Sequence, residues 1–153
     1  FRHHLDAGEQ VGKTGLRDLG FLVEQIALGD ELDLMIRGDL RHRDAGDHAG
    51  AIATFRELLA AYPRHDYADN AQYWLGEAYY DQKDYARAVP EFQATVSTYP
   101  LGNKVPDALL KVGLSYAALG EPAKARAALE QVIRQFPTTV PATIAATRLE
   151  QLP

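Results

Sequence analysis

The chain has 153 residues, of which 46% are hydrophobic and 24% are charged, so it is long enough and apolar enough for one folded domain. A net charge of −5, with both signs interspersed, argues against a protein that binds nucleic acid through its phosphates. The sequence has no cysteine, which excludes disulfides and thiolate metal sites. No apolar run approaches the ~20 residues of a membrane span. Because the sequence begins at Phe1 rather than Met, we expect a fragment or a mature form.

Residues 1–32 are the least regular part of the sequence, with glycines at positions 8, 12, 15, 20 and 29. Each glycine disfavours a helix by roughly 1 kcal/mol relative to alanine. Leucine, valine and isoleucine share one helical face between positions 16 and 27, which predicts a helix near residues 16–28 in a partly flexible lead-in. A heptad pattern for a coiled coil is present, but Gly15, Gly29 and Asp33 interrupt it, so homo-oligomerisation stays an open alternative.

The sequence from residue 33 to residue 153 predicts pairs of amphipathic helices, an all-α domain. Tyr or Phe followed by Pro recurs with a spacing of 37 residues, from position 62 to 99 and from 99 to 136. This period predicts three helix pairs over about residues 33–63, 70–100 and 107–137 and a capping helix over residues 141–152. The predicted helices run over residues 33–44, 47–61, 69–82, 84–98, 106–119, 122–135 and 141–152. Pro90 falls inside one of them, where we expect a bend rather than a break.

The central helix pair carries the clearest motif, Leu75-Gly76-x2-Tyr79 followed by Ala88-x3-Phe92. Gly76 lets a neighbouring helix approach closely, while Tyr79 and Phe92 fill the space between helices. This pattern resembles the tetratricopeptide repeat (TPR). One helix pair of this kind cannot bury its apolar face alone, so the resemblance implies a stack of pairs, a TPR solenoid with a capping helix.

Two other groups of residues were weighed as sites for chemistry. Residues 7–14, AGEQVGKT, differ from the phosphate-binding loop pattern only at Ala7, but no buried strand precedes them as that loop requires. The five histidines show no zinc-type spacing, and no catalytic constellation is recognisable. We therefore favour a non-enzymatic domain without cofactor or metal, and a nucleotide-dependent enzyme or switch is the rival hypothesis.

Equivalent positions on the first helix of each pair predict a partner-binding groove, because the 37-residue period stacks them into rows. These rows combine large aromatic residues with a few charges, a composition typical of peptide-binding grooves. The predicted binding residues are Arg37, Tyr73, Trp74, Glu77, Tyr80, Leu110, Lys111 and Leu114. The alternative is that some of the apolar residues among them pack on the N-terminal segment or inside the superhelix.

A narrower resemblance rests on the segments YADNAQYWLGEAYY (67–80), DYARAVPEFQ (84–93) and residues 104–137. They are similar to the C-terminal domain of the Tol–Pal-associated periplasmic cell division coordinators, the CpoB/YbgF family, over roughly two thirds of the chain. The resemblance implies a periplasmic adaptor that binds the Tol energy-transducing protein and a peptidoglycan synthase. It would couple cell-wall synthesis to outer-membrane constriction during division. Family members also carry an N-terminal trimerising coiled coil, from which residues 1–32 depart. The alternative is a TPR subunit of an outer-membrane assembly or secretion complex.

Overall fold

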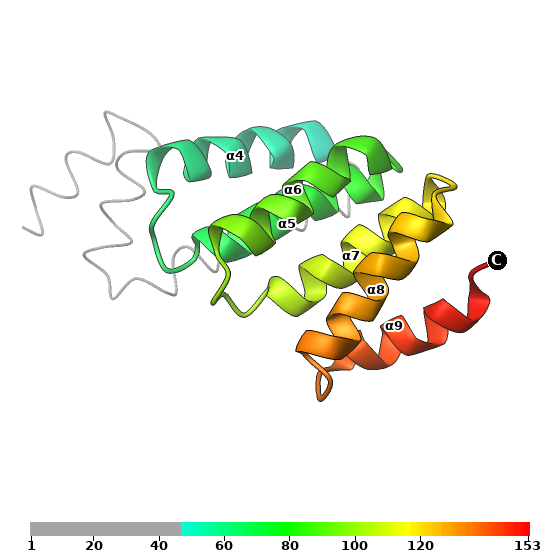
Figure 1. Cartoon of the computed structure of the whole chain (residues 1–153). Coiled ribbons are helices and arrows are strands. Elements are labelled where there is room, and N and C mark those ends of the chain that lie inside the picture. The colour runs from blue at the N-terminus through cyan, green and yellow to red at the C-terminus, as the bar shows by residue number, and fades with distance from the viewer. Residues whose placement is uncertain (1–46) are drawn as a thin grey trace, which may run out of the picture. The chain divides into compact units, whose positions relative to one another are not determined.

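The structure of the protein, a computed structural model, describes residues 47–153. In this range the chain forms helices and no strand, which confirms the all-α prediction. With the labels of Figure 1, the helices are α4 (His48–Ala61), α5 (Ala68–Asp81), α6 (Tyr85–Thr98), α7 (Val105–Ala118), α8 (Pro122–Gln135) and α9 (Val140–Gln151). The predicted lead-in over residues 1–32, the predicted helix over residues 33–44 and Arg37 lie outside the described residues.

The chain divides into two compact units, residues 1–71 and residues 72–153. The described part of the first unit contains α4 and the first turn of α5. In α4, the buried residues Ala51, Phe55 and Leu58 recur at helical spacing and form its apolar stripe. The second unit contains the rest of α5 and the helices from α6 to α9, together with every described residue of the predicted binding groove.

Helix starts follow from short polar side chains and prolines in the sequence. Asp47, Asp84 and Thr139 precede α4, α6 and α9, and each accepts a hydrogen bond from the backbone N–H three residues on. These caps satisfy N–H groups that have no partner inside the helix. At α8 the first helical residue is Pro122, which has no N–H to satisfy. Local chemistry therefore explains why the helices begin close to their predicted starts.

Helix α6 runs unbroken from Tyr85 to Thr98 through Pro90. The buried residues Ala88 and Phe92 lie on either side of this proline, which is itself exposed. The apolar stripe of α6 thus continues across a residue that removes one backbone hydrogen bond. This confirms that the helix is not broken at Pro90.

Two glycines allow close helix packing at matching positions of successive repeats. A Cβ built on Gly76 of α5 would lie 2.7 Å from two ring carbons of Phe92 in α6. One period later, a Cβ built on Gly113 of α7 would lie 2.6 Å from a methyl carbon of Leu129 in α8. Real side chains do not tolerate such distances, so the helices approach this closely because the two residues are glycine. The predicted role of Gly76 is confirmed.

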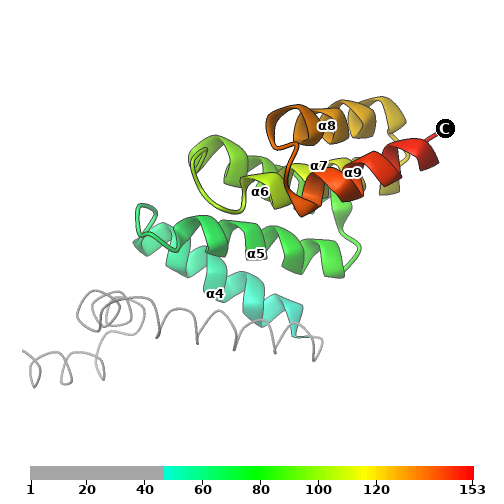
Figure 2. The same ribbon diagram turned by 90° about the horizontal axis from the view of Figure 1, so that it is seen from below.

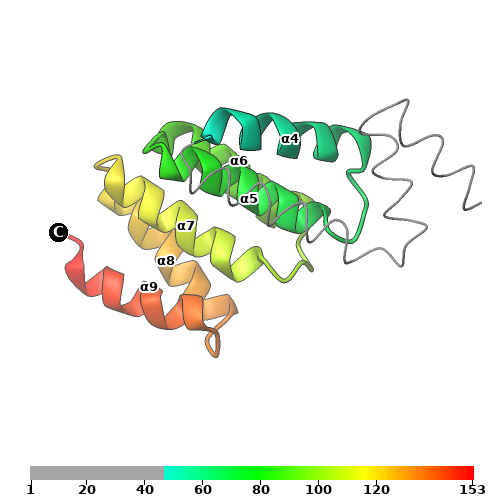
Figure 3. The same cartoon turned by 180° about the vertical axis from the view of Figure 1, so that it is seen from behind.

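Helices α6 to α9 stack in chain order, as the colours from green to red show in Figure 1. Helix α7 contacts α6, α8 and α9, and α8 also contacts α9. Helix α8 lies in front of α7 in Figure 1 and behind it in Figure 3. In the view of Figure 2, α8 lies above α7 and α9. The core between these helices is formed by Val105, Leu109, Leu110, Leu129, Val132, Ala142 and Ala145. Contact between α7 and α9, the first helices of successive pairs, is the arrangement of a helical-repeat solenoid.

Candidate partner-binding site

The structure separates the predicted binding residues by their accessibility. Tyr73, Glu77 and Leu110 are buried, with at most 8% of their surface exposed. The remaining described residues are half-buried and carry the accessible surface of the site: Trp74, Tyr80, Lys111 and Leu114. The accessible site is therefore narrower than the sequence predicts.

The burial of Tyr73 follows from its position between aromatic rings. Its ring centroid lies 5.5 Å from that of Phe92, a fully buried residue of α6, and 5.0 Å from that of Trp74, which it meets edge-on. Offset and edge-on ring pairs of this kind each contribute about 0.5–1.5 kcal/mol beyond area burial. Tyr73 therefore acts as a support that holds Trp74 rather than as a contact surface.

Lys111 of α7 connects this helix to α5 by two interactions. Its Nζ lies 3.0 Å from Oε1 of Glu77 and 4.2 Å from the ring centroid of Tyr80. The Lys111 and Glu77 side chains are only 22% and 11% exposed. Removing one partner of such a shielded ion pair leaves the other charge poorly solvated, which destabilises the fold. The carboxylate of Glu77 is thus engaged inside the site, and the Tyr80 ring is held under a cation.

A second cation, Lys104, lies over the rings of Tyr73 and Trp74. Lys104 is the residue before α7, and its Nζ lies 5.1 Å from the ring centroid of Trp74 and 5.2 Å from that of Tyr73. Cations at such distances are attracted by the negative face of the ring. Lys104 was not among the residues predicted from the sequence, because the repeat period aligns positions within helices and Lys104 belongs to a loop.

The environment of Tyr80 brings α9 into the site. Burial raises the pKa of Tyr80, and Tyr85, Glu77 and Asp81 raise it further, whereas the positive charge of Arg148 in α9 lowers it. The ring centroid of Tyr85 lies 5.1 Å from that of Tyr80. Arg148 is exposed and lies 37 residues after Lys111, so it extends the row of Trp74 and Lys111 onto α9. Arg148 was not predicted as a binding residue, because the sequence suggested only a capping role for α9, although the 37-residue period points to Arg148.

In the described part of the chain, the candidate site consists of aromatic rings and cations. Within residues 47–153, no three His, Asp or Glu side chains gather where a metal ion could be held. In the same range, no helix has the length and apolarity needed to cross a membrane. The phosphate-loop-like segment 7–14 lies outside the described residues. The geometry suits non-covalent binding of a partner segment.

Comparison with known families agrees with the helix pattern. Two family models, each described as tetratricopeptide repeat, match the chain, one over residues 40–103 and the other over residues 107–139. The second match covers α7 from residue 107 onward and all of α8, which together form one helix pair. Among curated proteins, none matches the chain. These matches confirm the tetratricopeptide repeat predicted from Gly76 and its neighbours. They do not identify a narrower family within it.

Proposed function

We propose that this chain of tetratricopeptide repeats is a non-enzymatic adaptor that captures a segment of a partner protein. Its binding surface is the Trp74 face, which we define as Trp74, Tyr80, Lys104, Lys111 and Arg148. Tetratricopeptide repeats are generally non-catalytic modules for protein interaction, which supports this class of function. The observation that carries the proposal is that the chain's only tryptophan is half-buried and contacts both the Tyr73 ring and the Lys104 ammonium group.

The tryptophan is the residue expected to contribute most to binding. Interface residues that contribute most are enriched in Trp, Tyr and Arg, and an ordered ring loses little conformational entropy on binding. The cations beside Trp74 and Tyr80 favour a segment with polar or acidic groups next to an apolar one. Among the described residues, neither Lys104 nor Arg148 forms an ion pair within the chain, so both charges are available to a partner.

For the identity of the partner, we propose the Tol energy-transducing protein and a peptidoglycan synthase, in the periplasm of a dividing cell. The support for this finer proposal is the resemblance of residues 67–80, 84–93 and 104–137 to the Tol–Pal-associated coordinators. A pull-down from envelope extract tests it, with recovery of the Tol protein as the expected result. Recovery of outer-membrane assembly or secretion components instead would favour the alternative function. A nucleotide titration tests the rival switch hypothesis, and we expect no binding that depends on Lys13.

The Trp74→Ala variant tests the binding surface itself. We expect it to weaken binding of the partner by about 2 kcal/mol or more, a factor of roughly 30, because the ring supplies the apolar contact. Isothermal titration calorimetry against the Tol partner measures this, beside a circular-dichroism melt. Trp74→Phe, which keeps an aromatic ring, is the matched control and should lose less affinity. A folded Trp74→Ala variant with unchanged affinity would place the site elsewhere.

Lys104→Ala and Arg148→Ala should cost less affinity than Trp74→Ala. Exposed charges at the edge of an interface act mainly on the association rate and on its salt dependence. Lys111→Ala is not an equivalent test, because it also leaves the shielded Glu77 carboxylate without its cation.

A further inference from the structure

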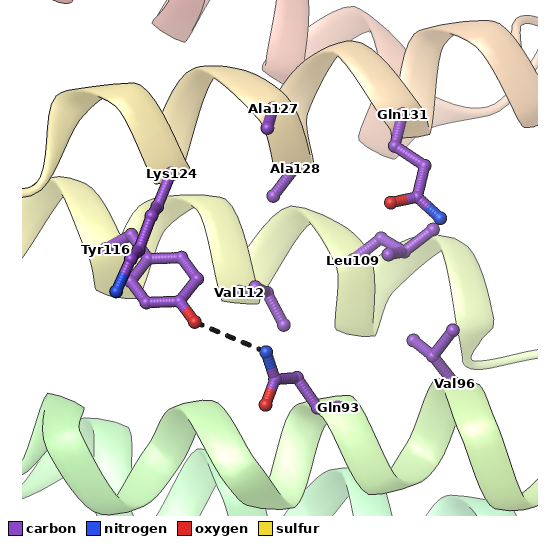
Figure 4. Close-up of a pocket in the computed structure, with 9 residues that line it drawn as sticks. All are labelled: Gln93, Val96, Leu109, Val112, Tyr116, Lys124, Ala127, Ala128 and Gln131. Carbon is purple, nitrogen blue, oxygen red and sulfur yellow. Dashed lines mark hydrogen bonds between the residues drawn. The ribbon is translucent and has the colours of Figure 1, made fainter.

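A pocket of about 350 Å³ lies between α6, α7 and α8 and shares no residue with the Trp74 face. Its floor is apolar and is formed mainly by Val96, Leu109, Val112 and Ala128. Figure 4 shows these side chains pointing into the space between the three helices. A volume at the low end of the range for ligand sites, about 300–1,000 Å³, suits one bulky side chain rather than a cofactor.

Two residues that line the pocket are smaller or less polar than their counterparts in the second repeat. In the second repeat, Nε2 of Gln72 donates to the backbone carbonyl of Glu91 at 3.1 Å and to its Oε1 at 2.9 Å, which bridges α5 and α6. One period later these positions hold Leu109 and Ala128. An alanine side chain ends at Cβ and a leucine cannot form the bridge, so the space above Leu109 stays open.

Two glutamine side chains border this apolar floor. Gln93 comes from α6 and Gln131 from α8, on opposite sides of α7 (Figure 4). Nε2 of Gln93 donates a hydrogen bond to the hydroxyl of Tyr116 at 3.3 Å, drawn as a dashed line in Figure 4. Each amide has both donors and an acceptor and can therefore pair with peptide groups.

The pocket is electrically neutral, although one charged residue lines it. Nζ of Lys124 lies 3.0 Å from Oε1 of Glu121 and 5.5 Å from the ring centroid of Tyr116. The hydrogen bond to Glu121 raises the pKa of Lys124, in keeping with a charge that is matched within the chain. The other lining residues are uncharged. A charged ligand would therefore bring an unmatched charge onto an apolar floor, which is unfavourable.

We propose that this pocket binds an uncharged segment of a partner protein and takes one leucine or phenylalanine side chain onto its floor. The Gln93 and Gln131 amides pair with the peptide groups on either side of that residue. The pocket would be a second contact surface of the adaptor, and its test is independent of the Trp74 face.

The probes that test the proposal are N-acetyl-leucinamide and N-acetyl-phenylalaninamide, added to the full chain and followed by NMR. We expect saturable shifts of the Val96 and Leu109 methyl groups and of the Gln93 and Gln131 side-chain amides. The dissociation constant should be at least about tenfold lower than that of N-acetyl-glutamic acid amide, a difference of about 1.4 kcal/mol. The absence of saturable shifts, or equal binding of the charged probe, would overturn the proposal.

Substitutions on and beside the pocket lining locate the binding in the pocket. Ala127→Leu adds a side chain at an exposed position that lines the pocket, and should weaken binding of the apolar probes at least about tenfold. Ala123→Leu makes the same change at an exposed position of α8 outside the lining and should leave binding unchanged. Ala128→Leu, which fills the floor, is the second variant if Ala127→Leu alters the fold. Trp74→Ala should not affect probe binding. Unchanged binding in a folded pocket-filling variant would refute the assignment.

Discussion

Because Gly76 has no side chain, α5 and α6 pack closely at this residue. We expect Gly76→Leu to lower the free energy of unfolding by about 1–3 kcal/mol or more, because the added atoms would overlap the buried Phe92 ring. Urea denaturation measures the change. Ala86→Leu, at an exposed position of α6, adds similar volume without such an overlap and should have little effect. An unchanged midpoint for Gly76→Leu would mean that the helices do not meet at this residue.

Tyr80 makes a pH-dependent contribution to stability. Its pKa in the folded chain is raised above the ordinary value of 10.0, chiefly by burial. As the pH rises past 10, the unfolded chain therefore releases this proton first, and unfolding becomes more favourable. The free energy of unfolding should fall more steeply with pH above 10 in the wild type than in Tyr80→Phe. Urea denaturation from pH 9 upward measures both slopes, and parallel curves would contradict the prediction.

Helix α6 has a local conflict between helix propensity and packing at Pro90. We expect Pro90→Ala to raise the free energy of unfolding by up to about 3 kcal/mol, because alanine restores a backbone donor and Pro90 is exposed. Pro122→Ala is the matched control, since a proline in the first position of a helix is well tolerated. A loss of stability in Pro90→Ala would show that contacts of the proline ring contribute more to the free energy of unfolding than the missing hydrogen bond would.

The helices and their ends could be predicted because their signals are local in the sequence. Helix α8 begins and ends where predicted, at Pro122 and Gln135. Helices α7 and α9 begin one residue before the prediction, since Pro106 and Pro141 occupy the second helical position rather than the first. The Leu75-Gly76-x2-Tyr79 motif also identified the glycine contact at Gly76.

The accessible part of the site could not be predicted in the same way. Periodicity places Tyr73 and Leu110 on the correct helices but does not say which neighbours cover them. Lys104 reaches the aromatic rings from a loop, where helical spacing gives no information. Burial and loop geometry depend on contacts distant in the sequence, so these features needed the structure.

At the scale of the whole molecule, α9 covers the last apolar face of the second unit. Ala142 and Ala145 belong to its core, and Leu149 and Leu152 pack against that core. Deletion of residues 140–153 should lower the free energy of unfolding by roughly 2–4 kcal/mol, since it exposes this apolar surface to water. Thermal melts measure the loss. Val140→Ala, at a residue that is 72% exposed, is the control and should melt like the wild type. A truncated chain with an unchanged melt would show that α9 is not needed as a cap.

The glycine contacts described above also bear on how a chain of this kind can change its length. The pairing of Gly76 with Phe92 returns as Gly113 with Leu129, each 37 residues later. Gain or loss of a whole 37-residue unit would preserve every interface of this kind. Insertion of one residue within a helix would instead rotate all later residues of that helix by about 100° and turn its apolar stripe away from the core. Gene duplication in whole units is thus compatible with this architecture, whereas small insertions are compatible only in its loops.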